Sequence, residues 1–107
     1  KIVHICGRLR SVYHLLDSLH CDAFSFDAMV GAHEVKPYLT GKAVMGNVST
    51  HALGVMPREK VKQLTAAAYK QGMDILAPAC GLPLTTPLAN IKAMAETARE
   101  LTERPHA

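Results

Sequence analysis

The chain alternates between short apolar runs and longer helical segments, and this alternation occurs four times. The apolar runs cover residues 1–6, 22–27, 42–48 and 73–80. Each run has the length and composition of a β-strand, and each is followed by a segment with helical periodicity. Strands joined by helical crossovers lie parallel, because only a long connection returns the chain to the same end of a sheet. The pattern therefore predicts an α/β fold built on a parallel sheet.

The first two helical segments are expected to be short or interrupted. The first is predicted to start near Ser11, an acceptable N-cap, and the second to cover about 32–39, where Pro37 shortens or kinks it. The residues expected on the buried face of the first helix are Val12, Leu15, Leu16 and Leu19. Both segments are therefore expected to cover the sheet with few turns.

The last two helical segments carry clearer boundaries. The third is expected to follow a loop ending in Pro57 and to end at Gly72, and the fourth to be capped by Thr86 with Pro87 at its first position. The residues expected to face the core are Val61, Leu64 and Ala68 in the third helix and Leu88, Ile91, Ala95 and Ala98 in the fourth. The tail from Thr102 onward is expected to fray.

Two architectures fit four βα units: an open doubly wound sheet, or half of an eight-stranded βα barrel. The turn after the first strand has a single glycine, Gly7, which argues against a dinucleotide-binding fingerprint. In both architectures functional groups gather at the carboxyl ends of the strands. Here those ends are Cys6, Asp27, Asn47 and Cys80.

His4 and Cys6 are the most informative polar residues of the strands. Strand residues two apart point to the same face, so their side chains are expected to lie together. Cys80 ends the fourth strand, and one imidazole with two thiolates is a ligand set suited to zinc. In a flat open sheet the first and fourth strands lie too far apart for such a site. The candidate ligands therefore favour a sheet that curves into a barrel.

Length and composition bound the class of protein. The 107 residues are enough for one modest domain, and the formal net charge is +3 with basic residues scattered along the chain. No nucleic-acid footprint and no apolar run of membrane-spanning length is present, so a cytoplasmic protein is expected. Three cysteines fit reduced thiols or metal ligands better than a disulfide framework. Because the sequence starts without Met inside a strand-like run, a C-terminal fragment of a longer protein is expected.

Several motifs carry a resemblance to a known family. They are Val-His-Ile-Cys-Gly at 3–7, Asp-Ala-Phe-Ser-Phe-Asp at 22–27, Gly-Asn-Val at 46–48, Ala-Pro-Ala-Cys-Gly-Leu-Pro at 77–83 and Thr-Pro-Leu-Ala-Asn-Ile-Lys-Ala-Met at 86–94. Together they resemble the C-terminal half of the methylcobamide:coenzyme M methyltransferases, which belong to the uroporphyrinogen decarboxylase superfamily. The resemblance implies that residues 1–107 form the C-terminal half of a TIM-type (β/α)8 barrel.

The resemblance also implies a reaction. Zinc held by His4, Cys6 and Cys80 would bind a small acceptor thiol such as coenzyme M, which takes a methyl group from a methylcobamide carried by a corrinoid protein. Asp27 is expected near the site as an exchangeable fourth ligand, as an acceptor for the imidazole of His4, or only as a cap of the next turn. Asn47 is expected to hydrogen-bond the substrate at the same mouth.

Other interpretations stay open. Arg8 and Arg10 either meet an acidic group of the acceptor or are solvated loop charges. The family often continues Gly-Asn-Val with Asp-Pro, where this chain has Ser-Thr at 49–50, so its acceptor or partner is expected to differ. A metal-free lyase resembling uroporphyrinogen decarboxylase and a non-catalytic fragment are the alternative functions. A half barrel has two open strand edges, so the missing half or self-association is expected to cover them.

Overall fold

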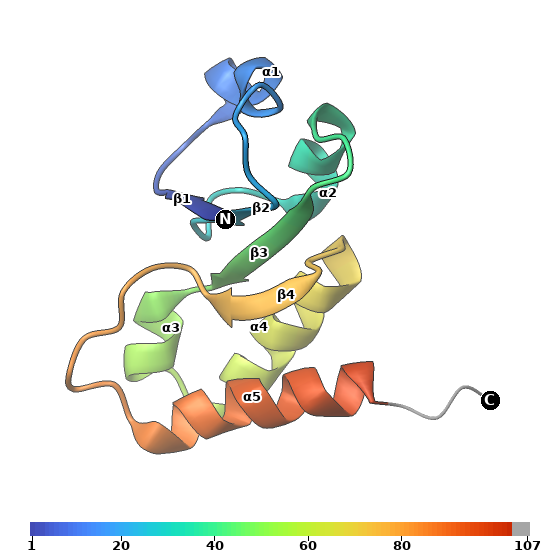
Figure 1. Ribbon diagram of the computed structural model, residues 1–107. Coiled ribbons are helices and arrows are strands. Elements are labelled where there is room, and N and C mark those ends of the chain that lie inside the picture. Colours follow the sequence, from blue (N-terminus) through green and yellow to red (C-terminus); the bar gives the residue numbers. More distant parts are fainter. Residues whose placement is uncertain (104–107) are drawn as a thin grey trace.

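Four parallel strands form the centre of the molecule in the computed structural model, which describes residues 1–103 (Figure 1). The strands are β1 (Ile2–Ile5), β2 (Ala23–Phe26), β3 (Ala43–Val48) and β4 (Ile75–Pro78), and they pair in the order β1-β2-β3-β4. A doubly wound sheet reverses its strand order at a switch point, whereas successive strands of a βα barrel are neighbours. The prediction of an α/β fold with four βα units, arranged as in half of a TIM-type (β/α)8 barrel, is therefore confirmed.

Helical elements follow every strand. They are η1 (Arg10–Val12) and α1 (Tyr13–Leu16) after β1, α2 (Ala32–Val35) and η2 (Lys36–Tyr38) after β2, α3 (Thr50–Val55) and α4 (Arg58–Gln71) after β3, and α5 (Leu88–Thr102) after β4. Pro37 lies in η2, where the α-helix has already ended, as predicted. Helix α3 was expected to be a loop. The residue that marks the start of this helix in the sequence is Ser49, whose hydroxyl caps the helix by accepting a hydrogen bond from the backbone N–H of Ala52.

The first helix differs from its prediction. Ser11 lies inside η1 and does not cap a helix, and α1 has only one turn. Leu15 and Leu19 are 54% and 42% exposed, and the burial comes from Tyr13 and Leu16. A helix of a single turn can direct only one pair of residues, three apart, toward the core. The helix is therefore too short to bury the four apolar residues that were expected on one face.

Helix α5 begins later and turns a different face to the core than predicted. Thr86 donates its hydroxyl to the carbonyl of Pro83 and does not cap the helix, and Leu88 is 63% exposed. The buried residues are Asn90, Ala93, Met94 and Thr97. The amide of Asn90 donates to the carbonyls of Leu53 and Met56, at the end of α3. The last carbonyls of a helix have no hydrogen-bond partner within the helix. Because Asn90 supplies hydrogen bonds to these two carbonyls, this polar residue faces the core.

Helix α4 agrees with its prediction. Val61 and Ala68 are buried, and Leu64 packs against a cluster of buried apolar residues from β3, α3, α4 and α5 that includes Val61. The helix ends at Gly72, which takes a left-handed conformation with φ of 107° and donates its N–H to the carbonyls of Ala68 and Tyr69. Figure 1 shows α4 and α5 packed beside β3 and β4.

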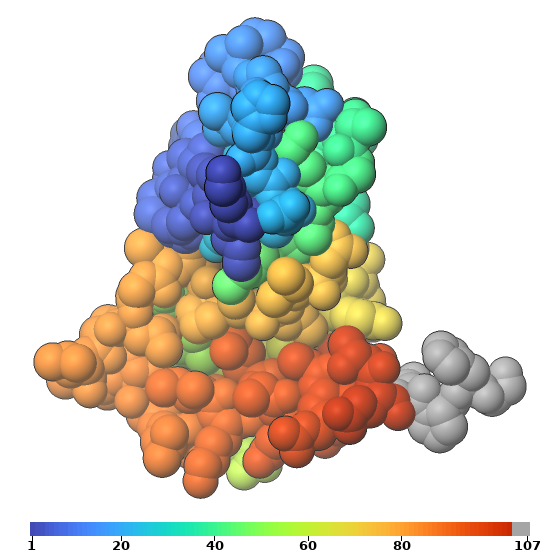
Figure 2. All heavy atoms as spheres, viewed as in Figure 1, coloured from blue at the N-terminus to red at the C-terminus, as the bar shows by residue number. Residues whose placement is uncertain are grey.

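The helices cover one face of the sheet and leave the other open. Phe24, Phe26 and Val44 are fully buried against the helices, whereas burial along β1 alternates and exposes His4 on the opposite face. Gly46 permits the close pairing of β2 and β3, because a Cβ there would lie 2.8 Å from the carbonyl oxygen of Phe26. In Figure 2 the N-terminal strand, in dark blue, lies open at the surface.

Two of the remaining expectations concern particular segments. Cys21 is partly buried and packs against the main core cluster, as a small apolar residue. The tail was expected to fray from Thr102 onward, but Thr102 is still the last residue of α5; residues 104–107 lie outside the described residues. Within residues 1–103, no helix is long and apolar enough to cross a membrane.

Candidate metal centre

His4, Cys6 and Cys80 meet on the open face of the sheet. The Nε2 atom of His4 lies 3.1 Å from the sulfur of Cys6, and the sulfurs of Cys6 and Cys80 are 3.5 Å apart. The three potential ligand atoms lie within 4.8 Å of one another, and all three residues are exposed. The three residues that the sequence marked as candidate ligands therefore form one cluster.

Curvature of the sheet brings these residues together. His4 and Cys6 lie at the end of β1, and Cys80 follows β4 by two residues. Three strand spacings separate β1 from β4 along the sheet, which in a flat sheet amounts to about 14 Å. Sulfur atoms 3.5 Å apart therefore require the strands to curl toward one another, as they do around a barrel.

The donor set and its spacing fit zinc. Tetrahedral zinc, with bonds of about 2.3 Å to sulfur and about 2.0 Å to nitrogen, sets two sulfurs about 3.8 Å apart and a sulfur and a nitrogen about 3.6 Å apart. The separation of 3.5 Å between the sulfurs of Cys6 and Cys80 and that of 3.1 Å between His4 and Cys6 lie a few tenths of an ångström below these values, and all three atoms lie within 4.8 Å of one another. Two thiolates and an imidazole also prefer a cation of intermediate softness, such as zinc. Three protein ligands leave a fourth position for a substrate.

Ser25 completes the cluster on the imidazole side. Its hydroxyl oxygen lies 2.8 Å from Nδ1 of His4, and the two residues are direct neighbours in the pairing of β1 with β2. Ser25 was not expected at the site. The sequence does show that Ser25 lies on the same strand face as Asp27. Its place beside His4, however, follows only from the register between β1 and β2.

The neighbouring thiol of Cys80 affects the pKa of Cys6. The hydrogen bond with Cys80 raises the pKa of Cys6, and desolvation and the negative charges of Cys80 and Asp27 add to this effect. Two thiolates this close repel each other unless a cation lies between them. A cation bound between the two sulfurs would favour the ionised form of the thiols.

Asp27 and Asn47 shape the loops around the cluster. One carboxylate oxygen of Asp27 accepts from the backbone N–H of Gly7 at 3.0 Å, and the other from that of Ala28 at 2.6 Å. Nδ1 of His4 faces Ser25 and not this carboxylate. The amide of Asn47 donates to the carbonyls of Asp27 and Val30. In the structure Asp27 thus caps the following turn, which was the third role expected of it. The side-chain amide of Asn47, expected to bind substrate, donates both of its hydrogen bonds to backbone carbonyls.

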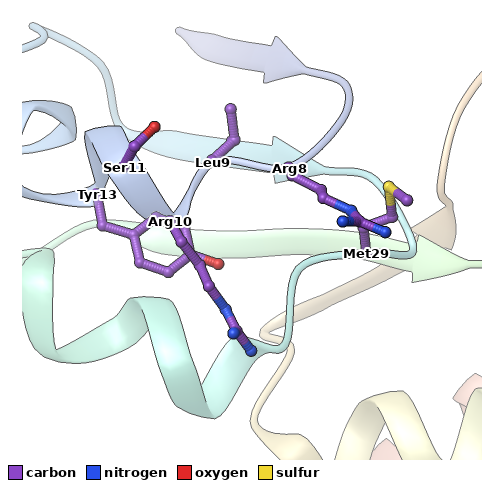
Figure 3. Close-up of a pocket in the computed structure, with 6 residues that line it drawn as sticks. All are labelled: Arg8, Leu9, Arg10, Ser11, Tyr13 and Met29. Atoms are coloured by element: carbon purple, nitrogen blue, oxygen red, sulfur yellow. The ribbon is translucent and has the colours of Figure 1, made fainter.

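Arg8 and Arg10 line a separate cavity of about 460 Å³ next to the end of β1, together with Leu9, Ser11, Tyr13 and Met29 (Figure 3). The guanidinium of Arg10 pairs with Glu34 at 2.9 Å. In Figure 3 the side chain of Arg8 extends instead toward Met29, and within residues 1–103 it has no ion-pair partner. Only one of the two arginines is therefore available for an anionic ligand.

A curved parallel sheet whose successive strands are neighbours and are joined by helices is typical of part of a βα barrel. The sequence model of the uroporphyrinogen decarboxylase (URO-D) family matches residues 1–101, and the chain belongs to this family.

Individual relatives narrow the comparison. The methylcobamide:CoM methyltransferase MtaA of Methanosarcina barkeri is 33% identical over 96 residues, which cover 87% of this chain and 28% of that protein. The methylated-thiol–coenzyme M methyltransferase of Methanosarcina mazei is 31% identical over 108 residues, covering 94% of this chain and 28% of that protein.

A solved structure, a methyltransferase from Methanosarcina mazei, matches with a TM-score of 0.85 and 29% identity over 94% of this chain and 31% of that one. The chain thus spans less than a third of the relatives it matches.

Proposed function

We propose that this chain is the zinc-binding part of a methyltransferase that moves a methyl group from a methylated corrinoid protein to a zinc-activated thiol such as coenzyme M. The observation that carries the proposal is the cluster of His4, Cys6 and Cys80 on an open face of the sheet. The relatives named for methylcobamide and coenzyme M support the choice of donor and acceptor.

The side chains of the cluster prepare the acceptor. A thiol with an ordinary pKa of about 8.5 is mostly protonated at neutral pH, and bound zinc would supply the positive charge that keeps it as a thiolate. His4, Cys6 and Cys80 occupy three positions around a cation and leave one for the acceptor sulfur. Their exposure leaves that sulfur open to a partner as large as a corrinoid protein.

Methyl transfer is then a displacement at carbon. The acceptor thiolate attacks the methyl group of the substrate methyl-Co(III), and a carbon–sulfur bond forms while the carbon–cobalt bond breaks. The electron pair of the broken bond stays with cobalt, which becomes Co(I), and the product is a thioether. The task of the chain is to hold the attacking sulfur at the mouth in line with the incoming methyl group.

Asp27 and Asn47 are proposed to support this site from the loops. Asp27 fixes the backbone of Gly7, directly after the ligand Cys6, and Asn47 fixes the backbone of Asp27 and Val30. Together they hold the rim of the mouth in the shape that the acceptor meets. A cytoplasmic location belongs to the same proposal, because the three cysteines are free thiols.

Metal analysis under reducing conditions tests the zinc site. The wild type is expected to carry one zinc per chain, and His4→Ala, Cys6→Ser and Cys80→Ser to lose most of it. Cys21→Ser is the matched control, since this thiol packs against the core away from the cluster, and it is expected to keep its zinc. A wild type without zinc contradicts the proposal.

A methyl-transfer assay tests the reaction. Methylcobalamin and coenzyme M are expected to give Co(I) and the methyl thioether with wild type and Cys21→Ser, and neither product with Cys80→Ser. Both assays use the protein in its natural length, because the relatives are more than three times as long as the matched segment.

The family description itself favours a second candidate, a metal-free decarboxylating lyase. Such an enzyme releases carbon dioxide from an acidic tetrapyrrole and keeps its activity when zinc is removed by a chelator. Loss of all activity with zinc removal separates the methyltransferase from the lyase. A protein that binds zinc and never transfers methyl to any thiol is the non-catalytic alternative.

A further inference from the structure

Ser25 is the one polar side chain pointing from β2 to the metal cluster. It is only 6% exposed, and its neighbours in the strand, Ala23, Phe24 and Phe26, are all buried and apolar. A buried hydroxyl costs free energy unless it is hydrogen-bonded, so a serine at this position needs a partner. Its side-chain partner among residues 1–103 is Nδ1 of His4, at 2.8 Å.

The pairing of β1 with β2 keeps this contact in place. His4 and Ser25 are aligned residue against residue in the parallel ladder, and the flanking pairs Val3–Phe24 and Ile5–Phe26 hold the register. A one-residue slip in the register would turn Ser25 to the helix side and Phe24 or Phe26 to the open face. Such a slip is unfavourable because it would expose phenylalanines that are fully buried. The contact therefore depends on the core of the fold and not on a flexible loop.

The two nitrogens of His4 have different surroundings. Nε2 lies 3.1 Å from the sulfur of Cys6 and faces the ligand cluster, whereas Nδ1 faces Ser25. An imidazole that binds a metal through Nε2 carries its proton on Nδ1 and needs an acceptor for it. The hydroxyl oxygen of Ser25 can accept that hydrogen bond, and it also fixes the rotation of the ring.

We infer that Ser25 is a positioning residue that orients the imidazole of His4 and accepts a hydrogen bond from its Nδ1–H, so that Nε2 binds zinc together with Cys6 and Cys80. The inference rests on the zinc site of the proposed function. It assigns to Ser25 a role in metal affinity that acts only through His4.

Three substitutions of Ser25 distinguish the effect of losing the hydroxyl from the effect of changing the size of the side chain. Ser25→Val and Ser25→Thr have nearly the same shape, and only threonine keeps the hydroxyl. Zinc affinity is measured by competition with a chromogenic chelator. Ser25→Val and Ser25→Ala are expected to bind zinc roughly 10- to 100-fold more weakly than wild type, as is usual for partners of metal-binding histidines. Ser25→Thr is expected within a few-fold of wild type, and Ser11→Ala, an exposed serine away from the cluster, to be unchanged.

A second readout does not depend on zinc. In the metal-free protein labelled with ¹⁵N-histidine, the Nδ1 resonance of His4 is expected to shift in Ser25→Val and to stay near the wild-type position in Ser25→Thr. If the wild type binds no zinc, the proposed function fails, and this resonance still tests the contact between Ser25 and His4. Equal zinc affinities in the threonine and valine variants, or a His4 resonance that no variant moves, would overturn the inference.

Discussion

At the scale of single residues, the candidate metal centre depends on which groups already have partners. His4 has Ser25, Arg10 has Glu34, and Asp27 has two backbone amides. Within residues 1–103, Cys6 contacts the imidazole of His4 and the sulfur of Cys80, and Cys80 contacts the sulfur of Cys6. The groups that lack a strong partner are thus the two thiols, which a cation would satisfy, and Arg8, which an anion would satisfy.

Arg8 is expected to recognise the acidic end of the acceptor. Coenzyme M carries a sulfonate, and Arg8 lies two residues after the ligand Cys6 without an ion pair among residues 1–103. Arg8→Ala is expected to raise KM for coenzyme M about tenfold, the usual effect of losing one charged hydrogen bond, with little change in kcat. Steady-state kinetics with methylcobalamin measures both constants.

Two controls define this prediction. KM for 2-mercaptoethanol, which has no acidic group, is expected to be the same in Arg8→Ala and wild type. Arg10→Ala is expected to change neither constant, because its guanidinium is already paired with Glu34. An equal rise of KM for both thiols would mean that Arg8 holds the loop and not the acceptor.

At the scale of elements, polar side chains help to decide how α5 and the segment after α1 pack. Asn90 turns α5 so that its amide meets the end of α3, and Asp17, just after α1, accepts from the backbone N–H of Thr40 and from the ammonium of Lys42. Both contacts join segments more than 20 residues apart in the chain. They hold the helical layer against the sheet on which the cluster is built.

Asn90→Ala is expected to destabilise the protein by about 2 kcal/mol. The substitution leaves the buried carbonyl of Leu53 and the partly buried carbonyl of Met56 without the donor they share, and an unsatisfied buried carbonyl costs about 1–3 kcal/mol. Urea unfolding followed by circular dichroism measures the change. Lys92→Ala on the exposed side of the same helix is the control, and an equal loss in both variants would contradict this role of Asn90.

Asp17 is expected to make stability depend on acid pH. The hydrogen bond from Thr40 and the ammonium of Lys42 lower its pKa from 3.8 to about 2. Because the folded protein holds the proton less tightly than the unfolded chain, this contribution is fully present above about pH 4 and is lost as the pH falls toward 2. The urea midpoint of the wild type should therefore fall through this window.

Asp17→Asn removes the titrating group and tests that assignment. The variant is expected to be less stable than wild type at pH 7 and to lose less stability between pH 4 and pH 2. Glu96→Gln, an exposed carboxyl on α5, serves as the control and should follow the wild-type curve. Parallel curves for wild type and Asp17→Asn would show that the contact with Lys42 carries no pH dependence.

At the scale of the whole molecule, the order of the strands, the buried face of α4 and the meeting of His4, Cys6 and Cys80 could be predicted from sequence, whereas the buried faces of α1 and α5 could not. Alternation of strand-like and helical runs determines a parallel sheet, and spacing puts His4 and Cys6 on one face. The role of Asn90 depends on where α3 ends, and that of Ser25 on the register of two strands. Both are contacts between distant segments, which local periodicity does not encode.

The open edges of the sheet lead to the last prediction. β1 and β4 each have one neighbour, and Ile2 and Ile75, one in each of these strands, are 56% and 41% exposed. Exposed apolar edges with free backbone groups favour pairing with another chain or with further strands of a barrel. The isolated 107-residue chain is therefore expected to self-associate at micromolar concentration, as measured by sedimentation velocity.

Substitution of the edges distinguishes edge pairing from other association. Ile2→Lys combined with Ile75→Lys places a charge at each edge, and edge lysines are a common means by which sheets avoid pairing. This double variant is expected to sediment as a monomer, whereas Leu84→Lys, at a fully exposed leucine of the loop before α5, is expected to associate as the wild type does. A wild-type chain that stays monomeric and stable at all concentrations would mean that its curved sheet tolerates open edges. In that case the half barrel would hold its ligand cluster without a partner.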